Sequence, residues 1–96
     1  MNEITYDQRL EVYTNALVTF GERTQMVVAL EELSECQKEI CKVLRGYCDV
    51  NHLSEEIADS LIMLEQVTYI FGLDCLVDME MERKIQRLEK RIGGAE

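Results

Sequence analysis

The sequence predicts an all-α fold arranged as a four-helix bundle, and three observations support this prediction. None of the 96 residues is proline, the residue that most strongly interrupts a helix. The segments between the glycines at positions 21, 46 and 72 are rich in Leu, Glu, Lys, Gln, Ala and Met, which favour helix. Apolar residues recur in these segments at intervals of three and four, as they do along one face of a helix.

The first two helices are expected at about Tyr6–Phe20 and Glu22–Leu44. Thr5 followed by Gln8 is a capping-box pattern, and Gly21 supplies a left-handed residue that can end the first helix. Each helix has an apolar stripe at helical spacing: Leu10, Tyr13, Leu17 and Phe20 in the first, and Ala29, Leu33, Cys36, Ile40 and Val43 in the second.

The third helix is expected at about His52–Phe71, with Asn51 or Ser54 as its cap. It is apolar on most of its circumference, so we expect it at the centre of a bundle or at a subunit interface. The fourth helix is expected at about Cys75–Ile92, capped by Asp74, with a core stripe of its own.

The composition predicts one small domain, residues 1–96, that favours oligomerisation because a chain this short buries only part of its apolar surface. A net charge of −9 disfavours nucleic acid as a partner. The apolar runs are shorter than a membrane span, and the N-terminus lacks the layout of a signal peptide. The four cysteines share no zinc-ligand spacing with His52 and are expected to be buried free thiols in a cytoplasmic protein.

Two acidic pairs stand on the expected second and third helices: Glu32 with Glu35, and Glu56 with Asp59. Residues three apart lie on one face of a helix, so each pair puts two carboxylates on one face. Large apolar residues flank both pairs, and buried carboxylates are usually paired or bound to metal. Four carboxylates between two helices repel one another unless a cation lies among them. We therefore predict a divalent-metal site on a helical hairpin.

This ligand set favours Mg²⁺, with Mn²⁺ as an alternative, because carboxylates without histidine suit hard cations. The sequence has neither the Glu-x-x-His motif of di-iron bundles nor an EF-hand loop. A hairpin that closes near residues 45 and 52 places the two pairs about 9 Å out of register, so Glu39 is a further candidate. His52, one turn before Glu56, is near enough to approach the site, but we expect a partly exposed residue at the start of its helix.

Basic residues form a stripe on the expected fourth helix, where Lys84, Arg87 and Arg91 follow one another at intervals of three and four. Cations near a helix C-terminus favour its dipole, which explains Arg91. Lys84 lies two turns further in and is explained less well by the dipole. The stripe is therefore a candidate contact for phosphate.

Two segments carry a resemblance to a known family: Glu31-Glu32-x-x-Glu35 and, after twenty residues, Glu56-x-x-Asp59. They resemble the EExxE…ExxD signature of the MazG-like, all-α NTP pyrophosphatase superfamily. The similarity extends over most of the chain, from the segment around Gln25 to Lys84-x-x-Arg87.

The resemblance implies hydrolysis of a nucleoside triphosphate to the monophosphate and pyrophosphate. It implies Mg²⁺ bound by the four acidic residues Glu32, Glu35, Glu56 and Asp59. It also implies a homo-oligomer, dimeric or tetrameric, whose active site is often completed by a neighbouring subunit.

The roles of the remaining candidates follow from this mechanism. Glu35 or Glu39 orients or deprotonates the attacking water, and the sequence leaves the choice between them open. Lys84 and Arg87 are expected to contact phosphate oxygens, and Gln25 the base or sugar.

Two other functions fit the same sequence. In one, the acidic stripes are solvated faces and the protein is a non-enzymatic helical oligomerisation module. In the other, the protein senses nucleotides without turning them over, since Glu82 stands where some members of the superfamily carry asparagine.

Overall fold

The computed structural model describes residues 3–94, in which there are four α-helices and no β-strand. The helices are α1 (Tyr6–Phe20), α2 (Glu22–Leu44), α3 (Val50–Phe71) and α4 (Asp74–Ile92). The all-α prediction is confirmed. The first two helices have the predicted bounds, and the other two begin slightly earlier than predicted.

The first helix is capped as its sequence predicts. The Thr5 hydroxyl accepts a hydrogen bond from the backbone N–H of Gln8, and the Gln8 side chain accepts one from the backbone N–H of Thr5. Gly21 then takes a φ of 90°, a value that favours glycine. This single residue separates α1 from α2 and turns the chain sharply between them.

The third helix is capped by a residue that the sequence prediction missed. The Asp49 carboxylate accepts a hydrogen bond from the backbone N–H of His52 at 3.1 Å, so Asp49 replaces the predicted Asn51 or Ser54. Asp74 is the first residue of α4 and makes no capping hydrogen bond with the helix. Both predicted caps are therefore wrong, because the sequence pattern did not locate the first residue of either helix.

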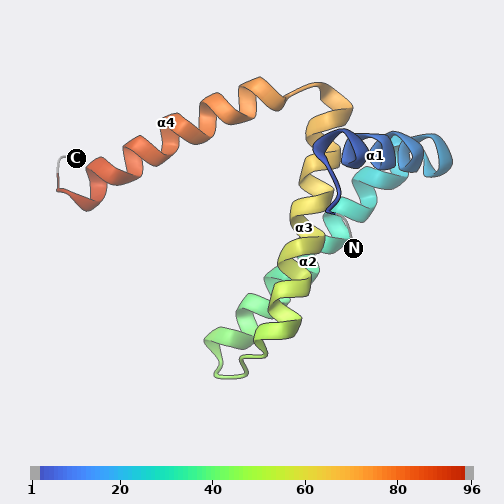
Figure 1. Ribbon diagram of the computed structural model, residues 1–96. Helices are drawn as coiled ribbons and strands as arrows, with labels where there is room; N and C mark the ends of the chain where they lie inside the picture. The colour runs from blue at the N-terminus through green and yellow to red at the C-terminus, as the bar shows by residue number, and fades with distance from the viewer. Residues whose placement is uncertain (1–2, 95–96) are drawn as a thin grey trace.

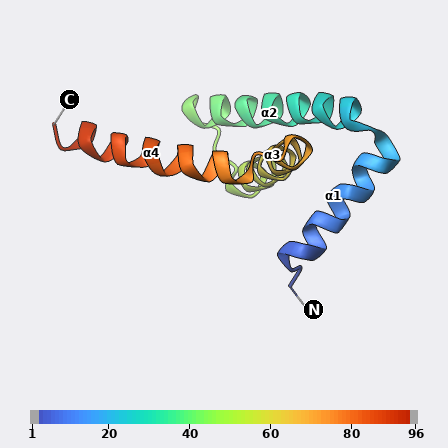
Figure 2. The same ribbon diagram turned by 90° about the horizontal axis from the view of Figure 1, so that it is seen from above.

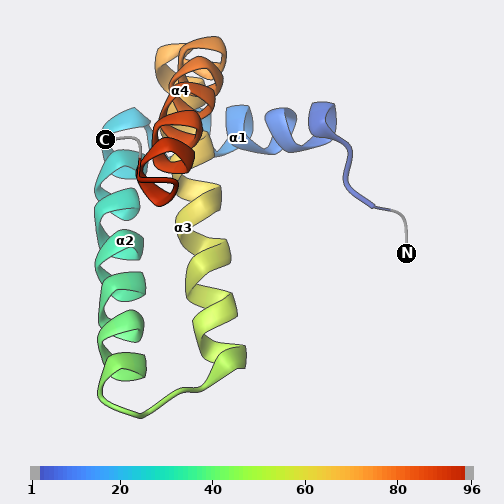
Figure 3. The ribbon, with the colours of Figure 1, turned by 90° about the vertical axis from the view of Figure 1, so that its left-hand side faces the viewer.

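The helices α2 and α3 form a long antiparallel hairpin and pack against each other along their length (Figure 3). The helix α1 lies across the end of this hairpin at which α2 begins and α3 ends (Figure 1). The helix α4 leaves the end of α3 and projects away from the other three (Figure 2). Within one chain the four helices therefore do not close into a bundle.

Few apolar side chains are buried in the described chain. The buried ones are Tyr13, Ala29 and Met63. The helix α3 contacts the other three helices, but Leu61 and Phe71 each remain 57% exposed, so a bundle does not enclose it within the single chain. Its alternative place at a subunit interface stays a prediction. The core stripe expected for α4 is also exposed along the whole helix. Within residues 3–94, these faces are left largely uncovered.

The accessible surface is large for a protein of this mass. The chain exposes 7832 Å², whereas a compact monomer of 11.2 kDa exposes about 5,700 Å². Its radius of gyration is 16.4 Å, against about 12.5 Å for a compact domain of this length. The difference reflects the projecting α4 and the uncovered faces of α2 and α3.

The cysteines contradict one expectation. Cys36 is half-buried, while Cys41, Cys48 and Cys75 are exposed, so the prediction of buried thiols is wrong for three of the four. Cys48 lies in the loop between α2 and α3, Cys75 lies in the first turn of α4, and Cys41 lies in the last turn of α2. As for membranes, every helix in residues 3–94 is too short or too polar to span one.

Candidate metal centre

The two acidic helices meet closely in the middle of the hairpin. Ser60 is buried on α3, and its hydroxyl donates a hydrogen bond to the backbone carbonyl of Glu32 at 3.1 Å. The small side chains of Ser60 and Ala29 let the two backbones approach. This contact fixes Glu32 of α2 opposite the segment of α3 that carries Glu56 and Asp59.

Three of the predicted ligands come together at this position. Glu32, Glu56 and Asp59 each offer one carboxylate oxygen, and these oxygens lie within 4.8 Å of one another. Glu32 and Glu56 are half-buried and Asp59 is exposed. The site is therefore a half-open acidic cluster between α2 and α3, which solvent reaches from the Asp59 side.

The electrostatics of the cluster are unfavourable without a cation. Partial burial raises the pKa of Glu32 above its ordinary value, and the nearby carboxylates of Asp59 and Glu56 raise it further. Glu35 and Glu31 contribute in the same direction. A positive ion among these groups would reverse the effect, because it favours the ionised carboxylates.

One buried oxygen of the cluster lacks a hydrogen-bond partner. Among the buried side-chain nitrogen and oxygen atoms of residues 3–94, only Glu56 Oε2 has no hydrogen-bond partner. A buried polar atom without a partner costs free energy, and native proteins rarely leave one without a reason. A metal ligand is such a reason, since the ion takes the place of the hydrogen-bond donor.

Glu39 lies beside the cluster and is held by two basic groups. Its side chain is only 6% exposed; Oε1 lies 3.0 Å from His52 Nδ1 and Oε2 lies 3.3 Å from Lys42 Nζ. On the other side of the ring, His52 Nε2 lies 3.4 Å from Glu56 Oε1. Glu39 is thus linked to the cluster through His52 and is not one of the three residues that converge.

The register of the hairpin explains why Glu32 and not Glu39 joins the cluster. Glu39 lies opposite His52, near the start of α3. The last turn of α2 therefore runs past the start of α3, and the loop folds back beside it, with the backbone N–H of Tyr47 bonded to the carbonyl of Lys42. The predicted mismatch of about 9 Å assumed helices that end level with each other.

Glu35, predicted both as a ligand and as a base, lies outside the three converging residues. Its side chain is 52% exposed and forms an ion pair with Lys38 at 3.3 Å. It is nevertheless near enough to Glu32 to raise the pKa of that carboxyl. Glu35 therefore stands at the solvent-facing margin of the cluster.

The predicted substrate contacts lie elsewhere in the chain. Gln25 is buried, and its amide donates a hydrogen bond to the amide oxygen of Gln66 at 2.8 Å, so it joins α2 to α3. Lys84 and Arg87 are exposed on α4, which points away from the hairpin (Figure 1). Neither basic residue is brought to the acidic cluster of its own chain.

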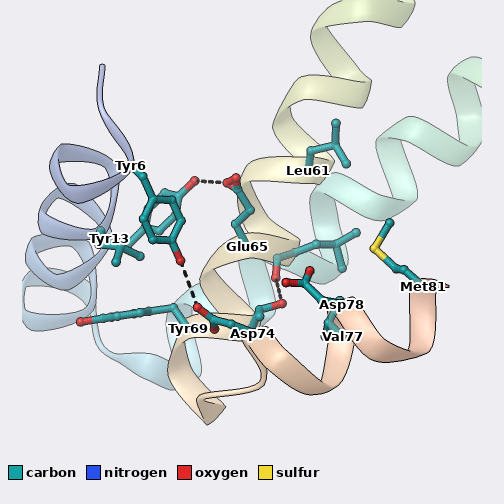
Figure 4. A pocket seen from close by; sticks show the side chains of 12 residues that line it. Tyr6, Tyr13, Leu61, Glu65, Tyr69, Asp74, Val77, Asp78 and Met81 are labelled. Atoms are coloured by element: carbon teal, nitrogen blue, oxygen red, sulfur yellow. Dashed lines mark hydrogen bonds between the residues drawn. The ribbon is translucent and has the colours of Figure 1, made fainter. Parts of the chain in front are cut away.

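A separate cavity of about 480 Å³ lies where α1, α3 and α4 meet (Figure 4). Tyr13 and Arg9 both bond to Glu65, at 2.9 and 2.6 Å, and the hydroxyl of Tyr6 donates to Asp74 at 3.0 Å. Burial, with the Glu65 contact, raises the pKa of Tyr13 to about 12. Glu65 lies nine positions after Glu56, about half a turn around α3, so this cavity opens away from the acidic cluster. Its bonds fasten α1 to α3 and to the start of α4.

Sequence reasoning missed several residues that shape the site. His52 is partly exposed and lies near the start of α3, as predicted, but its contact with Glu39 was not predicted. Its spacing of four from Glu56 was the available signal for a place beside the cluster. Ser60 and Gln66 gave no signal beyond being polar residues on an apolar helix. Such residues mark the face toward a neighbouring helix only once the register is known.

A scan against protein-family models, a search of curated proteins and a search of solved structures found no match for this chain.

Proposed function

We propose that this protein is a Mg²⁺-dependent nucleoside triphosphate pyrophosphohydrolase of the MazG-like type, which converts a (d)NTP and water to a (d)NMP and pyrophosphate. One observation carries the proposal: Glu32, Glu56 and Asp59 converge between two helices, at the spacing that resembles the acidic signature of that superfamily. The buried, unpartnered Oε2 of Glu56 supports the same conclusion.

The donor set fits a hard divalent cation. Glu32, Glu56 and Asp59 would hold Mg²⁺, with Mn²⁺ as the alternative, because both prefer oxygen ligands. A site with few protein ligands keeps positions for water and for substrate phosphates. When bound, such an ion neutralises phosphate charge and lowers the pKa of the attacking water. Partial burial and the neighbouring carboxylates raise the pKa of Glu32, and a bound cation would offset this repulsion.

Of the two candidate bases, we favour Glu35. Its carboxylate is half-exposed at the margin of the cluster and is held by a single lysine at 3.3 Å. Both oxygens of Glu39 are engaged, one by His52 and one by Lys42. A base must reach water beside the substrate, and Glu35 has the freedom to do so. Gln25 is assigned a structural role, since its amide is buried against Gln66.

We propose that the active unit is a homo-oligomer, a dimer or a tetramer. Half of the ten basic residues fall between Arg83 and Arg91, on a helix that projects from an otherwise acidic chain. The apolar stripe of α4 and the outer faces of α2 and α3 remain exposed. Association that covers these faces would bring Lys84 and Arg87 of one subunit toward the acidic cluster of another. We place the protein in the cytoplasm, because exposed thiols persist in a reducing compartment.

A substrate panel with a matched variant tests the activity. We expect the wild-type protein to release pyrophosphate from NTPs or dNTPs in the presence of Mg²⁺ and not of EDTA. Glu56→Gln should abolish this turnover and leave the circular-dichroism spectrum unchanged, because it removes charge and not volume. Full activity of this variant would remove Glu56 from the mechanism.

Mixing two inactive variants tests whether the site is shared between subunits. Glu56→Gln and Lys84→Ala damage different halves of the proposed site, so a mixed dimer contains one intact site if the halves come from different chains. After unfolding and refolding together, the mixture should regain about a quarter of wild-type activity, as random pairing in a two-fold dimer predicts. No recovery would mean that Lys84 serves its own chain.

A second candidate function is favoured by the exposed apolar faces. A helical oligomerisation module needs such faces and no catalysis. A nucleotide sensor is the intermediate case, since it would bind nucleotide and metal without turnover. In the substrate panel, binding without pyrophosphate would identify the sensor, and neither binding nor product would identify the module.

A further inference from the structure

A histidine at the edge of the acidic cluster has both ring nitrogens beside carboxylates. His52 Nδ1 lies 3.0 Å from Glu39 Oε1 on α2, and Nε2 lies 3.4 Å from Glu56 Oε1 on its own helix. The side chains of Glu39 and Glu56 are 6% and 14% exposed, against 44% for His52. The ring therefore joins a buried carboxylate of one helix to a cluster carboxylate of the other.

The two oxygens of Glu56 have different surroundings. Oε1 faces His52, whereas Oε2 is buried and without a hydrogen-bond partner. The contact with His52 opposes smaller rotations about the last side-chain bond of Glu56, which would turn the carboxylate plane and move an oxygen away from this buried position. The ring is held in turn, because Nδ1 lies 3.0 Å from Oε1 of Glu39, a side chain that is only 6% exposed.

We propose that His52 is a positioning residue for the metal centre. It fixes the carboxylate of Glu56 so that Oε2 is presented to the divalent cation, and Glu39 acts on the centre only through His52. This inference rests on the proposed function, because it requires a cation held by Glu32, Glu56 and Asp59. His52 is not assigned as a ligand, since it lies outside the three residues whose ligand atoms converge.

Removing His52 should change the metal affinity in opposite directions for two roles, one in which it orients Glu56 and one in which it acts only as a nearby charge. Removing a neighbouring cationic group tightens the binding of a metal ion, because less positive charge opposes it. Removing a group that orients a ligand weakens the binding. Partners that orient metal ligands change metal affinity by about 10- to 100-fold. This weakening exceeds the tightening expected from removing a charge at a partly exposed position.

The experiment measures Mn²⁺ binding by electron paramagnetic resonance on the full chain. His52→Ala should weaken binding about 10- to 100-fold. His52→Gln places an amide nitrogen near the former Nε2 and should keep affinity close to wild type. His52→Asn reaches only the Nδ1 position and should resemble His52→Ala. The two amide variants differ by one methylene, so a general loss of folding would not separate them.

Two further variants complete the design. Lys42→Ala removes a cation that contacts Glu39 and not Glu56, so it should leave Mn²⁺ binding unchanged or slightly tighter. Glu39→Gln should weaken binding less than His52→Ala does. The double variant should be weaker than His52→Ala only by the small effect of removing one nearby negative charge, because the orienting effect of Glu39 passes through His52.

The outcomes separate this inference from the proposed function. Tight Mn²⁺ binding by the wild type, lost in His52→Ala and kept in His52→Gln, supports both. Tight binding that His52→Ala leaves unchanged or strengthens overturns the positioning role and leaves the metal site standing. No Mn²⁺ binding by the wild type overturns the metal site and the positioning role together.

Discussion

The interface between α2 and α3 has two halves that are built from the same helices and differ in chemistry. Near α1, the buried residues are neutral, with Ala29 and Met63 beside the hydrogen-bonded amides of Gln25 and Gln66. Toward the turn, the facing residues are the acids of the cluster, together with Glu39 and His52. In the first half each polar group has a partner, and in the second one buried oxygen has none.

The neutral half of the interface stabilises the helix pair, and the acidic half carries the candidate site. A satisfied amide pair with apolar neighbours costs nothing further and holds the helices in register. Crowded carboxylates lower stability unless a ligand relieves them. Local conflict of this kind is expected at functional sites and is tolerated because the rest of the structure is consistent. The neutral half therefore supports the acidic half.

The largest effect that would test this comparison comes from a side chain in the neutral half. Met63 is buried at 6% exposure, and removing a buried methionine side chain costs about 2 to 5 kcal/mol. Met63→Ala should lower the free energy of unfolding by this amount in urea denaturation at fixed protein concentration.

The matched control for that variant is Met79→Ala. Met79 is 67% exposed on α4, and surface substitutions usually change stability by less than about 0.5 kcal/mol. Equal losses of unfolding free energy in the two variants would mean that association buries Met79 as deeply as Met63. The neutral half of the hairpin would then contribute no more to stability than α4 does.

A smaller effect is expected from the amide pair. Gln25→Ala leaves the buried amide oxygen of Gln66 without its donor and should cost about 1 to 3 kcal/mol of stability. Replacing both residues by leucine should be close to neutral, since no polar group is then left unpaired. If Gln25 contacted substrate instead, the single variant would raise KM and leave stability unchanged.

The sequence predicted the elements of this fold better than their packing. Helical spacing, the Thr5 capping box and Gly21 located α1 and α2 at their observed bounds, because these signals are local. The apolar stripe of α2 was expected to face the core, and Ala29 does so, but Leu33 and Ile40 stay exposed. Polar residues lie on the face toward α3 beside Ala29, namely Gln25, Glu32 and Glu39. Amphipathicity identifies a face, and it does not say whether the partner is the same chain or another.

The candidate site was predictable in part for a similar reason. Spacing of three placed Glu56 and Asp59 on one helical face, and the second helix supplied Glu32 opposite them. The role of Glu39 depends on how far the last turn of α2 overhangs α3, which a loop conformation decides. Sequence patterns leave such registers open, so the contact between Glu39 and His52 had no signal strong enough to predict it.

The smallest expected effect concerns charge in the acidic half. The pKa of Glu32 is raised above its ordinary value of 4.5 by partial burial and then by its acidic neighbours, so the folded state binds a proton more tightly than the unfolded state. Stability then falls as pH rises from 4.5 through the raised pKa, and the penalty persists at neutral pH. Without metal, Glu32→Gln should therefore be slightly more stable than wild type at neutral pH, with the difference vanishing below pH 4.5.

Adding Mg²⁺ should reverse that order, and the reversal is what distinguishes a metal site from a merely strained surface. A ligand that binds only the folded state stabilises it by about 2.7 kcal/mol at 100 times its dissociation constant, and Glu32→Gln removes one ligand and so most of this gain. Thermal unfolding with EDTA and with Mg²⁺ measures both signs in one series. Glu55→Gln, an exposed carboxylate on α3 outside the cluster, should keep the full effect of Mg²⁺. A Glu32→Gln variant that gains as much as wild type from Mg²⁺ would show that the acidic half binds no ion through Glu32.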